Sequence, residues 1–384
     1  MIPDTPLALY VHWPFCVLKC PYCDFNSHVR DTVDQDAWRD ALLADLAHET
    51  RVLPGRTLGS IFFGGGTPSL MPPATVAAIL DAAQQAWTPA ADIEITLEAN
   101  PSSVEAARFA DLAAAGVNRV SLGLQALEED ALRFLGRAHG VAEGLAALDT
   151  AQRAFARVSF DLIYALPDQG LAAWEAELAR ALSFGTEHLS LYQLTIEPGT
   201  RFATEAAKGR LTVPDGDAAA DLFEATRAMT AAAGLPAYET SNHARTGAES
   251  RHNLTYWRYG DYAGVGPGAH GRRGGLATAR RKKPENWLAA VARNGHGIEI
   301  EEPLAPHDRA TEALLMGLRL AEGVALSRIA GLAGGTAPID HAAAGRLETL
   351  GLIAIDSKRL RVTEAGALLL DAILPQIVAD RAAA

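Results

Sequence analysis

The chain has 384 residues, of which 49% are hydrophobic, and a formal net charge of -12. The acidic balance argues against nonspecific nucleic-acid binding, because neutralising phosphates requires clustered Lys and Arg. No stretch reaches the ~20 apolar residues of a membrane helix, and the first residues lack the basic and apolar regions of a signal peptide. We therefore expect a cytoplasmic protein with one large domain and a smaller one.

All three cysteines of the chain follow the first predicted strand, Leu7–Trp13. Cys16, Cys20 and Cys23 have the spacing C-x3-C-x2-C. Three thiolates are one ligand short of a structural zinc site, but they can hold three corners of a [4Fe–4S] cube and leave the fourth iron open. In this sequence context, the expected ligand of the open iron is S-adenosylmethionine.

Other interpretations of the cysteine loop stay open. His12 or His28 could complete a zinc site as the fourth ligand. The thiols could also be buried and inert, although three of them within eight residues fit that role poorly. Tyr22, next to the last cysteine, could lie against an adenine ring or pack within its own loop.

Five more predicted strands alternate with helices after the cysteine loop. Their residues are mostly apolar without strict alternation, as in strands buried on both faces of a parallel sheet. The predicted strands cover residues 60–63, 93–97, 119–124, 158–164 and 188–194, and the predicted helices cover residues 36–52, 74–86, 104–115, 142–155 and 172–184. Six strand–helix units predict an α/β fold, a partial (β/α)6 barrel within residues 1–235.

Glycine and polar residues follow these strands, at the ends that carry the active site in parallel barrels. Gly65 and Gly66 would let the backbone approach the amino group of a ligand, and Thr67 could add a hydroxyl. Glu98 could accept hydrogen bonds from a ribose. The alternatives are a tight strand–helix turn for the glycines and a helix N-terminal charge for Glu98.

Three further polar residues come from the next strand–helix units. Gln125 follows the fourth predicted strand, Asp161 lies in the fifth, and Arg137 lies between them. These residues could bind a second polar ligand, whereas Arg137 alone could equally lie on the surface of a helix. Because several independent strand ends point polar groups to one rim, the sequence favours a ligand site there.

The strand–helix pattern changes after residue 235. A strand is predicted at 238–244, and residues 260–275 contain seven glycines, which we interpret as an irregular connection. The basic residues Arg272, Arg273 and 280–283 are expected in a solvated loop. Contact of this basic segment with an anionic ligand or a membrane surface is the alternative.

The last part of the chain is predicted to be a separate, mainly helical domain. Its sequence contains a predicted hairpin at 351–363 and a last helix at 364–378. A helical domain with a two-stranded wing would be winged-helix-like. The predicted domains are thus the barrel at 1–235, a barrel extension at 236–305 and the C-terminal domain at 306–384.

The aromatic segment 252–257 reads His-Asn-Leu-Thr-Tyr-Trp. Haem iron takes axial His ligands, and a porphyrin face packs on aromatic rings. His252, Asn253, Tyr256 and Trp257 are therefore candidate haem-binding residues. The alternative is a structural histidine, which is the more frequent role of a lone His near aromatic side chains.

Together, these motifs closely resemble the radical S-adenosylmethionine superfamily, and within it the HemN/HemW group, over nearly the whole chain. The resemblance implies that the three cysteines ligate the cluster and that Tyr10, Gly65 and Glu98 contact a first S-adenosylmethionine. In the oxidases of the group, a second S-adenosylmethionine is held at the positions that match Tyr22, Gly66, Thr67, Gln125, Arg137 and Asp161.

The group contains oxygen-independent coproporphyrinogen III oxidases and haem chaperones. The oxidases carry C-x3-C-x2-C-x-C and a long N-terminal extension, whereas Phe25 stands at the fourth cysteine's position and nine residues precede Tyr10. The chaperone signature His-Asn-x-x-Tyr-Trp is intact at 252–257. The resemblance therefore implies a haem chaperone, with a radical decarboxylase of coproporphyrinogen III as the alternative.

The resemblance also implies the partners. They are haem, as cargo, and haem-recipient proteins such as respiratory-chain enzymes, with no nucleic acid among them. Peripheral membrane contact and a homodimer stay open as further expectations.

Overall fold

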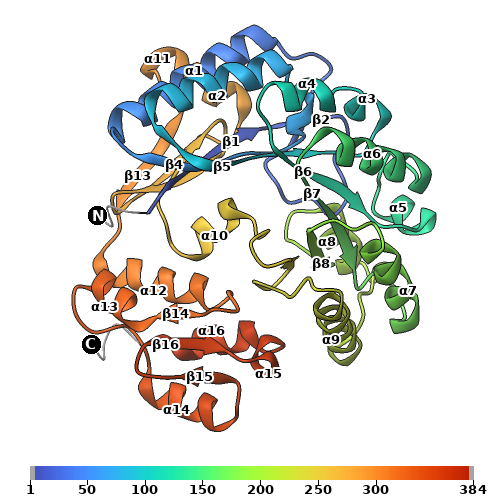
Figure 1. Cartoon of the computed structure of the whole chain (residues 1–384), viewed down its shortest axis with the longest axis vertical. Coiled ribbons are helices and arrows are strands. Elements are labelled where there is room, and N and C mark those ends of the chain that lie inside the picture. Colours follow the sequence, from blue (N-terminus) through green and yellow to red (C-terminus); the bar gives the residue numbers. More distant parts are fainter. Residues whose placement is uncertain (1–4, 380–384) are drawn as a thin grey trace.

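The protein is a curved sheet with helices on its convex side and a smaller domain across its open side (Figure 1). The computed structural model describes residues 5–379. The prediction that the chain lacks a signal peptide rests in part on residues 1–4 and lies outside the described residues. Between residues 5 and 379, no helix is long and apolar enough to cross a membrane.

Six parallel strands, adjacent in chain order, form the middle of the sheet and confirm the predicted α/β partial barrel. They are β1 (Leu7–Trp13), β4 (Thr57–Gly65), β5 (Thr88–Ala99), β6 (Arg119–Gln125), β7 (Arg157–Tyr164) and β8 (His188–Gln193). Their apolar side chains belong to one large core, as the lack of strict alternation predicted. The loop after β1 adds the short pair β2 (Phe15–Cys16) and β3 (His28–Val29).

The convex face of the sheet carries the helices that connect these strands (Figure 1). Four of them match the predicted helices: α1 (Gln35–Val52), α2 (Pro73–Ala86), α6 (Val141–Ala154) and α7 (Leu171–Leu182). Asp34 caps α1, because its Oδ1 accepts a hydrogen bond from the Ala37 N–H at 3.1 Å. The structure adds the helices α5 (Glu129–Phe134), α8 (Arg201–Ala207) and α9 (Gly216–Ala232) and the 3-10 helix η1 (Pro68–Leu70), which were not predicted.

Two predicted helices are each divided in two. The helix predicted at 104–115 consists of α3 (Ser103–Ala106) and α4 (Phe109–Ala114), and the last helix consists of α15 (Glu364–Ala367) and α16 (Leu370–Ile377). Arg108, between α3 and α4, donates to the carbonyl of Met71 at 2.7 Å. This tertiary contact holds the chain where a continuous helix was expected.

The prediction of an irregular glycine-rich connection at 260–275 is wrong. This segment forms β10 (Tyr262–Val265), which pairs in parallel with β1, and β11 (His270–Arg273), which continues the sheet. A Cβ on Gly264 would lie 1.9 Å from the carbonyl oxygen of His270, and a Cβ on Gly271 would lie 2.5 Å from Thr278 Oγ1. Glycines are therefore needed here because the strands approach closely, and they do not mark a break in the sheet.

The sheet has eleven strands in total. β12 (Leu276–Arg280) and β13 (Ile298–Pro303) extend it beyond β11 in antiparallel fashion, and α11 (Pro284–Asn294) connects these two strands. At the other edge of the sheet, β9 (Asn242–Ala244) pairs with β8. The strand predicted at 238–244 is therefore shorter than expected and begins at Asn242.

The basic segment is not the solvated loop that the sequence predicted. Arg272, Arg273 and Arg280 are 7%, 6% and 1% exposed. The guanidinium of Arg272 lies 3.6 Å from the centre of the Tyr259 ring, and Arg280 pairs with carboxylates of α1. Arg272 and Arg273 are consecutive in β11, so their side chains lie on opposite faces of the sheet, and both faces are covered there. Lys282 remains exposed beside them.

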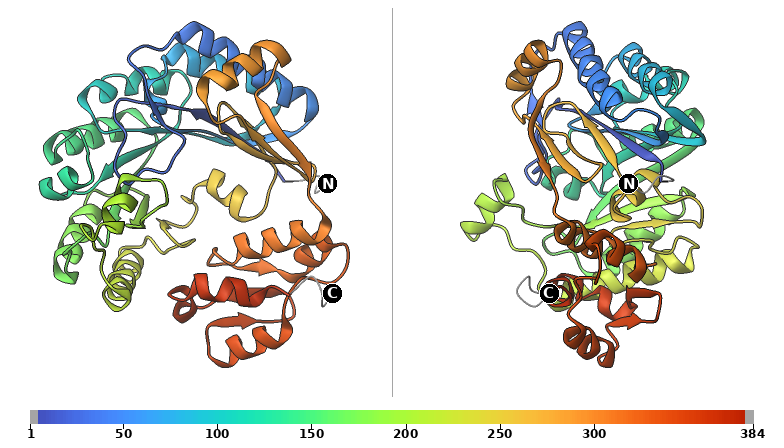
Figure 2. Two further views of the ribbon diagram at one scale, coloured as in Figure 1. Left: turned by 180° about the vertical axis from the view of Figure 1, so that it is seen from behind. Right: turned by 90° about the vertical axis from the view of Figure 1, so that its left-hand side faces the viewer.

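The helix α10 (Arg251–Trp257) lies on the concave side of the sheet, opposite the other barrel helices (Figure 1, Figure 2). It contacts β4 and β1 of the sheet and α12 of the C-terminal domain. Ser250 caps it, because its Oγ accepts a hydrogen bond from the Asn253 N–H at 3.3 Å. The candidate haem-binding segment therefore lies inside the barrel.

The C-terminal region has its own hydrophobic core and fits the winged-helix-like prediction. It contains α12 (Pro306–Gly317), α13 (Leu326–Ala333), α14 (His341–Thr349) and a three-stranded sheet of β14 (Val324–Ala325), β16 (Arg359–Val362) and β15 (Ile353–Ile355). The predicted hairpin is the antiparallel pair β15–β16. The domain boundaries at 235/236 and 305/306 stay predictions.

Candidate functional site

The cysteine loop opens onto a cavity at the carboxyl ends of the parallel strands. Cys16 ends β2, and Cys20 and Cys23 lie in the turn that follows; all three are partly exposed free thiols. All three line one cavity of about 140 Å³. Because each corner iron of a cubane needs one thiolate, three cysteines around one cavity fit a [4Fe–4S] cluster.

Hydrogen-bond donors surround the cysteine sulfurs. Thr67 Oγ1 donates to Cys16 Sγ at 3.3 Å, and Arg137 Nη1 lies 3.4 Å from Cys20 Sγ. Burial raises the pKa of the Cys16 thiol. A nearby cation or metal favours the thiolate, so the guanidinium and the irons of a cluster would both act against the effect of burial.

The zinc interpretation finds little support in the geometry. Among residues 5–379, no three His, Cys, Asp or Glu side chains converge on one metal position. Both ring nitrogens of His12 are already hydrogen-bonded, Nδ1 to the Tyr10 hydroxyl at 2.9 Å and Nε2 to the carbonyl of Asn26 at 3.0 Å. His28 Nε2 lies 3.1 Å from the side-chain oxygen of Asn26.

The glycines after β4 allow backbone to form the wall of the cavity. Gly65 has φ +112°, and a Cβ at this position would lie 2.5 Å from the ring of His12. A Cβ on Gly66 would lie 2.7 Å from the carbonyl oxygen of Phe15. The Gly65 N–H donates to Glu98 Oε2 at 3.2 Å. The backbone at this turn therefore has no room for side chains and orients the carboxyl of Glu98.

Two partly buried carboxyl groups face the same cavity. Burial, and then the charge of Asp161, raise the pKa of Glu98 to about 8. Burial raises the pKa of Asp161 to about 6, although Ser121 Oγ donates to it at 3.3 Å. At neutral pH, Glu98 is thus mostly a carboxylic acid, which can both donate to and accept from a hydroxyl pair.

Arg137 lies in the cavity, so the alternative of a surface helix residue is wrong. It follows α5 and donates from Nη2 to Asn100 Oδ1 at 2.7 Å and to the carbonyl of Gly123 at 3.0 Å. Its buried Nε has no partner among the described residues. Gln125, at the end of β6, has φ +71°, an uncommon conformation for a residue other than glycine. An unpartnered buried donor and a strained strand end are both features of ligand sites.

The structure brings together eight of the nine residues predicted to bind S-adenosylmethionine. With the cysteines, they line the first cavity: Tyr22, Gly65, Gly66, Thr67, Glu98, Gln125, Arg137 and Asp161. The ninth, Tyr10, lines an adjacent second cavity. Sequence reasoning missed Asn100, whose amide donates to Thr67 Oγ1 at 3.0 Å and which also binds Arg137. The feature of the sequence that could have indicated Asn100 is its position two residues after Glu98, at the same strand end.

The second cavity has a volume of about 660 Å³ and shares Phe25, Gly65 and Glu98 with the first. Tyr256 and Trp257 of the candidate haem-binding segment line it. Further lining residues come from β1, from the strands beyond it and from the C-terminal domain: Tyr10, His12, Tyr262, His270, Lys282 and Met316. A cavity of roughly 300–1,000 Å³ with aromatic walls is the size of a site for a small molecule or cofactor.

His252 lies beneath this second cavity and is 1% exposed. Its Nδ1 lies 3.1 Å from Ser60 Oγ, and its Nε2 lies 2.7 Å from the Tyr256 hydroxyl. Burial lowers the pKa of His252 to about 3, so the imidazole is neutral. Asn253 donates its backbone N–H to the helix cap and, like His252, is absent from the cavity walls.

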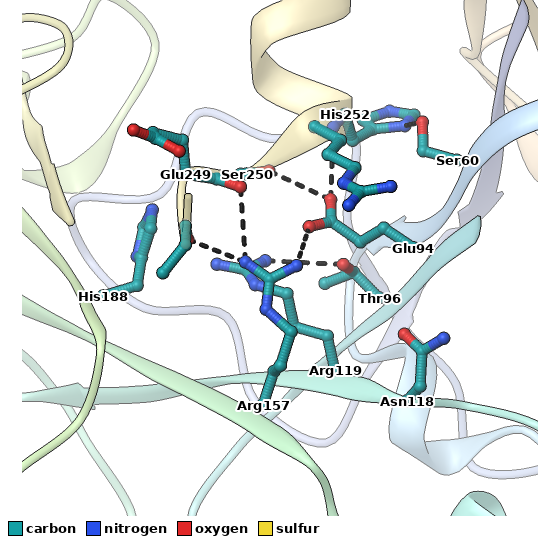
Figure 3. A network of polar contacts seen from close by, with 12 residues as sticks. Ser60, Glu94, Thr96, Asn118, Arg119, Arg157, His188, Glu249, Ser250 and His252 are labelled. Carbon is teal, nitrogen blue, oxygen red and sulfur yellow. Dashed lines mark hydrogen bonds and ion pairs between the residues drawn. The ribbon is translucent and has the colours of Figure 1, made fainter. Parts of the chain in front are cut away.

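A network of polar side chains holds the start of α10 against the sheet (Figure 3). The buried carboxylate of Glu94 accepts from the His252 N–H at 3.2 Å and from Arg157 Nη1 at 2.7 Å. Arg157 also donates to the carbonyl of Ala248 at 2.7 Å, and Arg119 donates to Ser159 Oγ at 3.0 Å. Sequence reasoning did not predict this network. The pattern that could have indicated it is the presence of charged residues within otherwise apolar strands.

Comparisons with known proteins agree with the geometry. The radical SAM superfamily matches residues 10–180, and the HemN C-terminal domain matches residues 304–369. The chain is 38% identical to the heme chaperone HemW of Escherichia coli, over 99% of this chain and 100% of that protein. It is 41% identical to the mitochondrial radical S-adenosyl methionine domain-containing protein 1 of Bos taurus, over 96% of this chain and 86% of that protein.

The fold is similar to a solved structure. Coproporphyrinogen III oxidase (HemN) from Escherichia coli, a radical SAM enzyme, has a TM-score of 0.82 to this structure. The match covers 97% of this chain and 90% of the oxidase, with 24% sequence identity. It shows that the two chains share the barrel and the C-terminal domain.

Proposed function

The chain belongs to the HemW family of the radical SAM superfamily, and on this premise we propose that it is a haem chaperone, which binds haem and transfers it to haem proteins. The observation that carries the proposal is the position of the His-Asn-x-x-Tyr-Trp segment. Tyr256 and Trp257 line a large aromatic cavity directly beside the cavity of the three cysteines.

In this proposal, Cys16, Cys20 and Cys23 hold a [4Fe–4S] cluster. S-adenosylmethionine binds in the same cavity, with Glu98 toward its ribose and the backbone at Gly65 toward its amino group. The unpartnered Nε of Arg137 donates a charge-assisted hydrogen bond to S-adenosylmethionine. The remaining predicted contacts are Tyr10, Tyr22, Gly66, Thr67, Gln125 and Asp161. When bound, the cluster would supply an electron to S-adenosylmethionine, and the protein's part is to hold the two together.

Haem occupies the second cavity. The rings of Tyr256 and Trp257 offer apolar faces for the porphyrin. As a candidate haem-binding residue, His252 could be an axial ligand or a near neighbour of the haem. Its burial and its two hydrogen bonds support the second role, in which it positions Tyr256 from beneath.

The oxidase is the second candidate function. It is favoured by the shared fold and by the match to the HemN C-terminal domain. Against it, Phe25 stands where the oxidases carry a fourth cysteine, and its side chain is 61% exposed at the wall between the two cavities. An anaerobic assay with coproporphyrinogen III separates the two functions: formation of protoporphyrinogen supports the oxidase, and its absence while 5′-deoxyadenosine forms excludes it.

The proposal includes haem-recipient proteins such as respiratory-chain enzymes, to which the chain would transfer haem. It also includes a cytoplasmic location, peripheral membrane contact and assembly as a homodimer. Relatives with mitochondrial names show that the family is not confined to bacteria. Arg272, Arg273 and Arg280 are buried, so the residues of the basic segment that could meet a membrane are Arg281, Lys282 and Lys283.

Haem titration of the anaerobically reconstituted protein tests the main proposal. We expect saturable binding with a defined Soret band, followed by transfer to an apo haem protein. Trp257→Ala should weaken binding, whereas Leu350→Ala, an exposed residue of the C-terminal domain, is the matched control. Weak, non-saturating binding, equal in both variants and in the unsubstituted protein, would contradict the proposal.

A further inference from the structure

The second cavity contains a histidine that no motif of the sequence indicated. His270, the first residue of β11, lines this cavity together with Tyr256, Trp257 and Tyr262. Haem proteins most often hold iron through a histidine. Assigning a haem-binding histidine in this cavity rests on the proposed function, in which haem is the cargo.

His252 is poorly suited to bind the iron. It is 1% exposed and lines neither of the two cavities at the cysteine loop. Both of its ring nitrogens are in hydrogen bonds, to Ser60 and to Tyr256, and its ring stacks on Phe62 at 4.9 Å between centres. To reach an iron in the cavity, it would have to break a hydrogen bond and move out from under the Tyr256 side chain.

His270 has the opposite properties. Its side chain is accessible at the cavity wall, and neither ring nitrogen has a hydrogen-bond partner among residues 5–379. Its backbone is fixed, because His270 pairs with Ala279 of β12 and Gly264 leaves room for its carbonyl. Partial burial and the charge of Lys282 lower the pKa of His270, which favours the neutral ring, the form that binds metals.

The surroundings of His270 fit the rest of a haem. Tyr256 and Tyr262 meet edge to face, with their ring centres 4.5 Å apart, and provide an apolar wall. The exposed ammonium of Lys282 lines the same cavity and is suited to pair with a propionate. Met316 of α12, on the C-terminal domain, also lines the cavity, and its thioether is another protein group here that could bind iron, as are the tyrosine hydroxyls.

We propose that His270 is the axial ligand of the bound haem, in the cavity lined by Tyr256, Trp257, Tyr262 and Lys282. His252 is then a positioning residue, which holds Tyr256. The C-terminal domain forms part of the wall through Met316, so the cargo lies between the barrel and that domain.

The test is a haemin titration of the full-length, anaerobically reconstituted protein, read by absorption and by electron paramagnetic resonance. For His270→Ala and His270→Gln, we expect loss of the histidine-ligated spectrum. We also expect a rise in Kd larger than the roughly 10- to 100-fold that loss of an outer-shell partner typically costs. Added imidazole should restore the spectrum of His270→Ala. His341→Ala, an exposed position of the C-terminal domain, is the control and should behave as the unsubstituted protein.

The remaining variants decide between ligands. His252→Ala should keep the histidine-ligated spectrum, with a weaker affinity at most. If both His270 variants keep the unsubstituted spectrum and Kd, or if the ligand signature is lost in His252→Ala or Met316→Leu instead, the assignment to His270 is overturned. If the unsubstituted protein binds no haem saturably, the proposed function itself fails, and the ligand assignment fails with it.

Discussion

Arg280 and Asp45 lie 235 residues apart in the chain and form an ion pair inside the protein. Arg280 Nε lies 2.6 Å from Asp45 Oδ2, and neither side chain is exposed to solvent. Arg280 also pairs with Glu49 at 2.8 Å, one turn further along α1. The pair joins the helix after the cysteine loop to β12, so it connects the barrel to the strands that carry His270.

We expect Arg280→Met to destabilise the protein strongly. The substitution leaves Asp45 buried without its cation, while Glu49 keeps only its pair with Arg273. Breaking one partner of a buried pair typically costs about 3–5 kcal/mol. Arg281→Met is the matched control, because its pair with Glu299 is 37% and 47% exposed and such pairs contribute about 0–1 kcal/mol. Urea unfolding of both variants measures the difference. Equal losses of unfolding free energy would contradict the argument.

The cluster prediction is tested on the cysteines. Cys20→Ala should lose the iron–sulfur absorbance and most of the iron after anaerobic reconstitution, because a cubane with two protein ligands is exposed to solvent and poorly held. Ser27→Ala, which removes only a weak contact of 3.8 Å to Cys23 Sγ, should keep both. Iron, sulfide and zinc are measured together. One zinc per chain without iron would return support to the zinc site.

The role of Arg137 is tested by a conservative change. Arg137→Lys keeps the positive charge but removes the unpartnered Nε and the fork of donors. We expect the Kd of S-adenosylmethionine to rise about 10-fold, since a hydrogen bond to a charged group is worth ~1.5–3 kcal/mol. Arg133→Lys, on the exposed face of α5, is the control. Calorimetry on the reconstituted protein measures both, and an unchanged Kd for Arg137→Lys contradicts the assignment.

Glu98 makes the stability of the ligand-free protein depend on pH. Its pKa is raised from 4.5 to about 8, so the folded state keeps a proton that the unfolded chain loses. The stabilisation is complete below about pH 4.5, declines as pH rises toward 8 and is lost above it. Asp161, with its pKa raised to about 6, adds to the lower part of this decline.

Glu98→Gln removes this contribution. The unfolding free energy of the variant, relative to the unsubstituted protein, should increase between about pH 5 and pH 8, since the amide carries no charge to bury. Glu302→Gln, at an exposed position of β13, should show a constant difference. Chemical unfolding at several pH values measures both. A constant difference for Glu98→Gln would show that Glu98 ionises normally in the fold.

Much of the cluster cavity could be predicted because its residues follow strands. The carboxyl ends of parallel strands meet at one edge, so Gly65, Glu98, Gln125 and Asp161 had to come together once the strands were identified. Asn100 was missed, although it lies at the same edge and binds both Thr67 and Arg137. Its position two residues after Glu98 was the only indication, because a single amide has no distinguishing spacing of its own.

The second cavity could not be predicted in the same way. The segment 260–275 was expected to be irregular, whereas its glycines allow strands to approach within contact distance. His270 therefore had no predicted element to position it. The basic residues were expected in solvent, and only the buried Asp45 and Glu49 of a distant helix explain why Arg280 points inward.

By itself, the sequence determined the α/β barrel, the grouping of the three cysteines in one loop and the winged C-terminal domain. These features depend on local periodicity and on spacing within one segment, and both are written in consecutive residues. Only the tertiary structure decided that His252 is buried beneath Tyr256 while His270 faces the cavity. Which of two histidines can reach a ligand depends on contacts between β1, α10, β11 and α12, and those elements are distant in the chain.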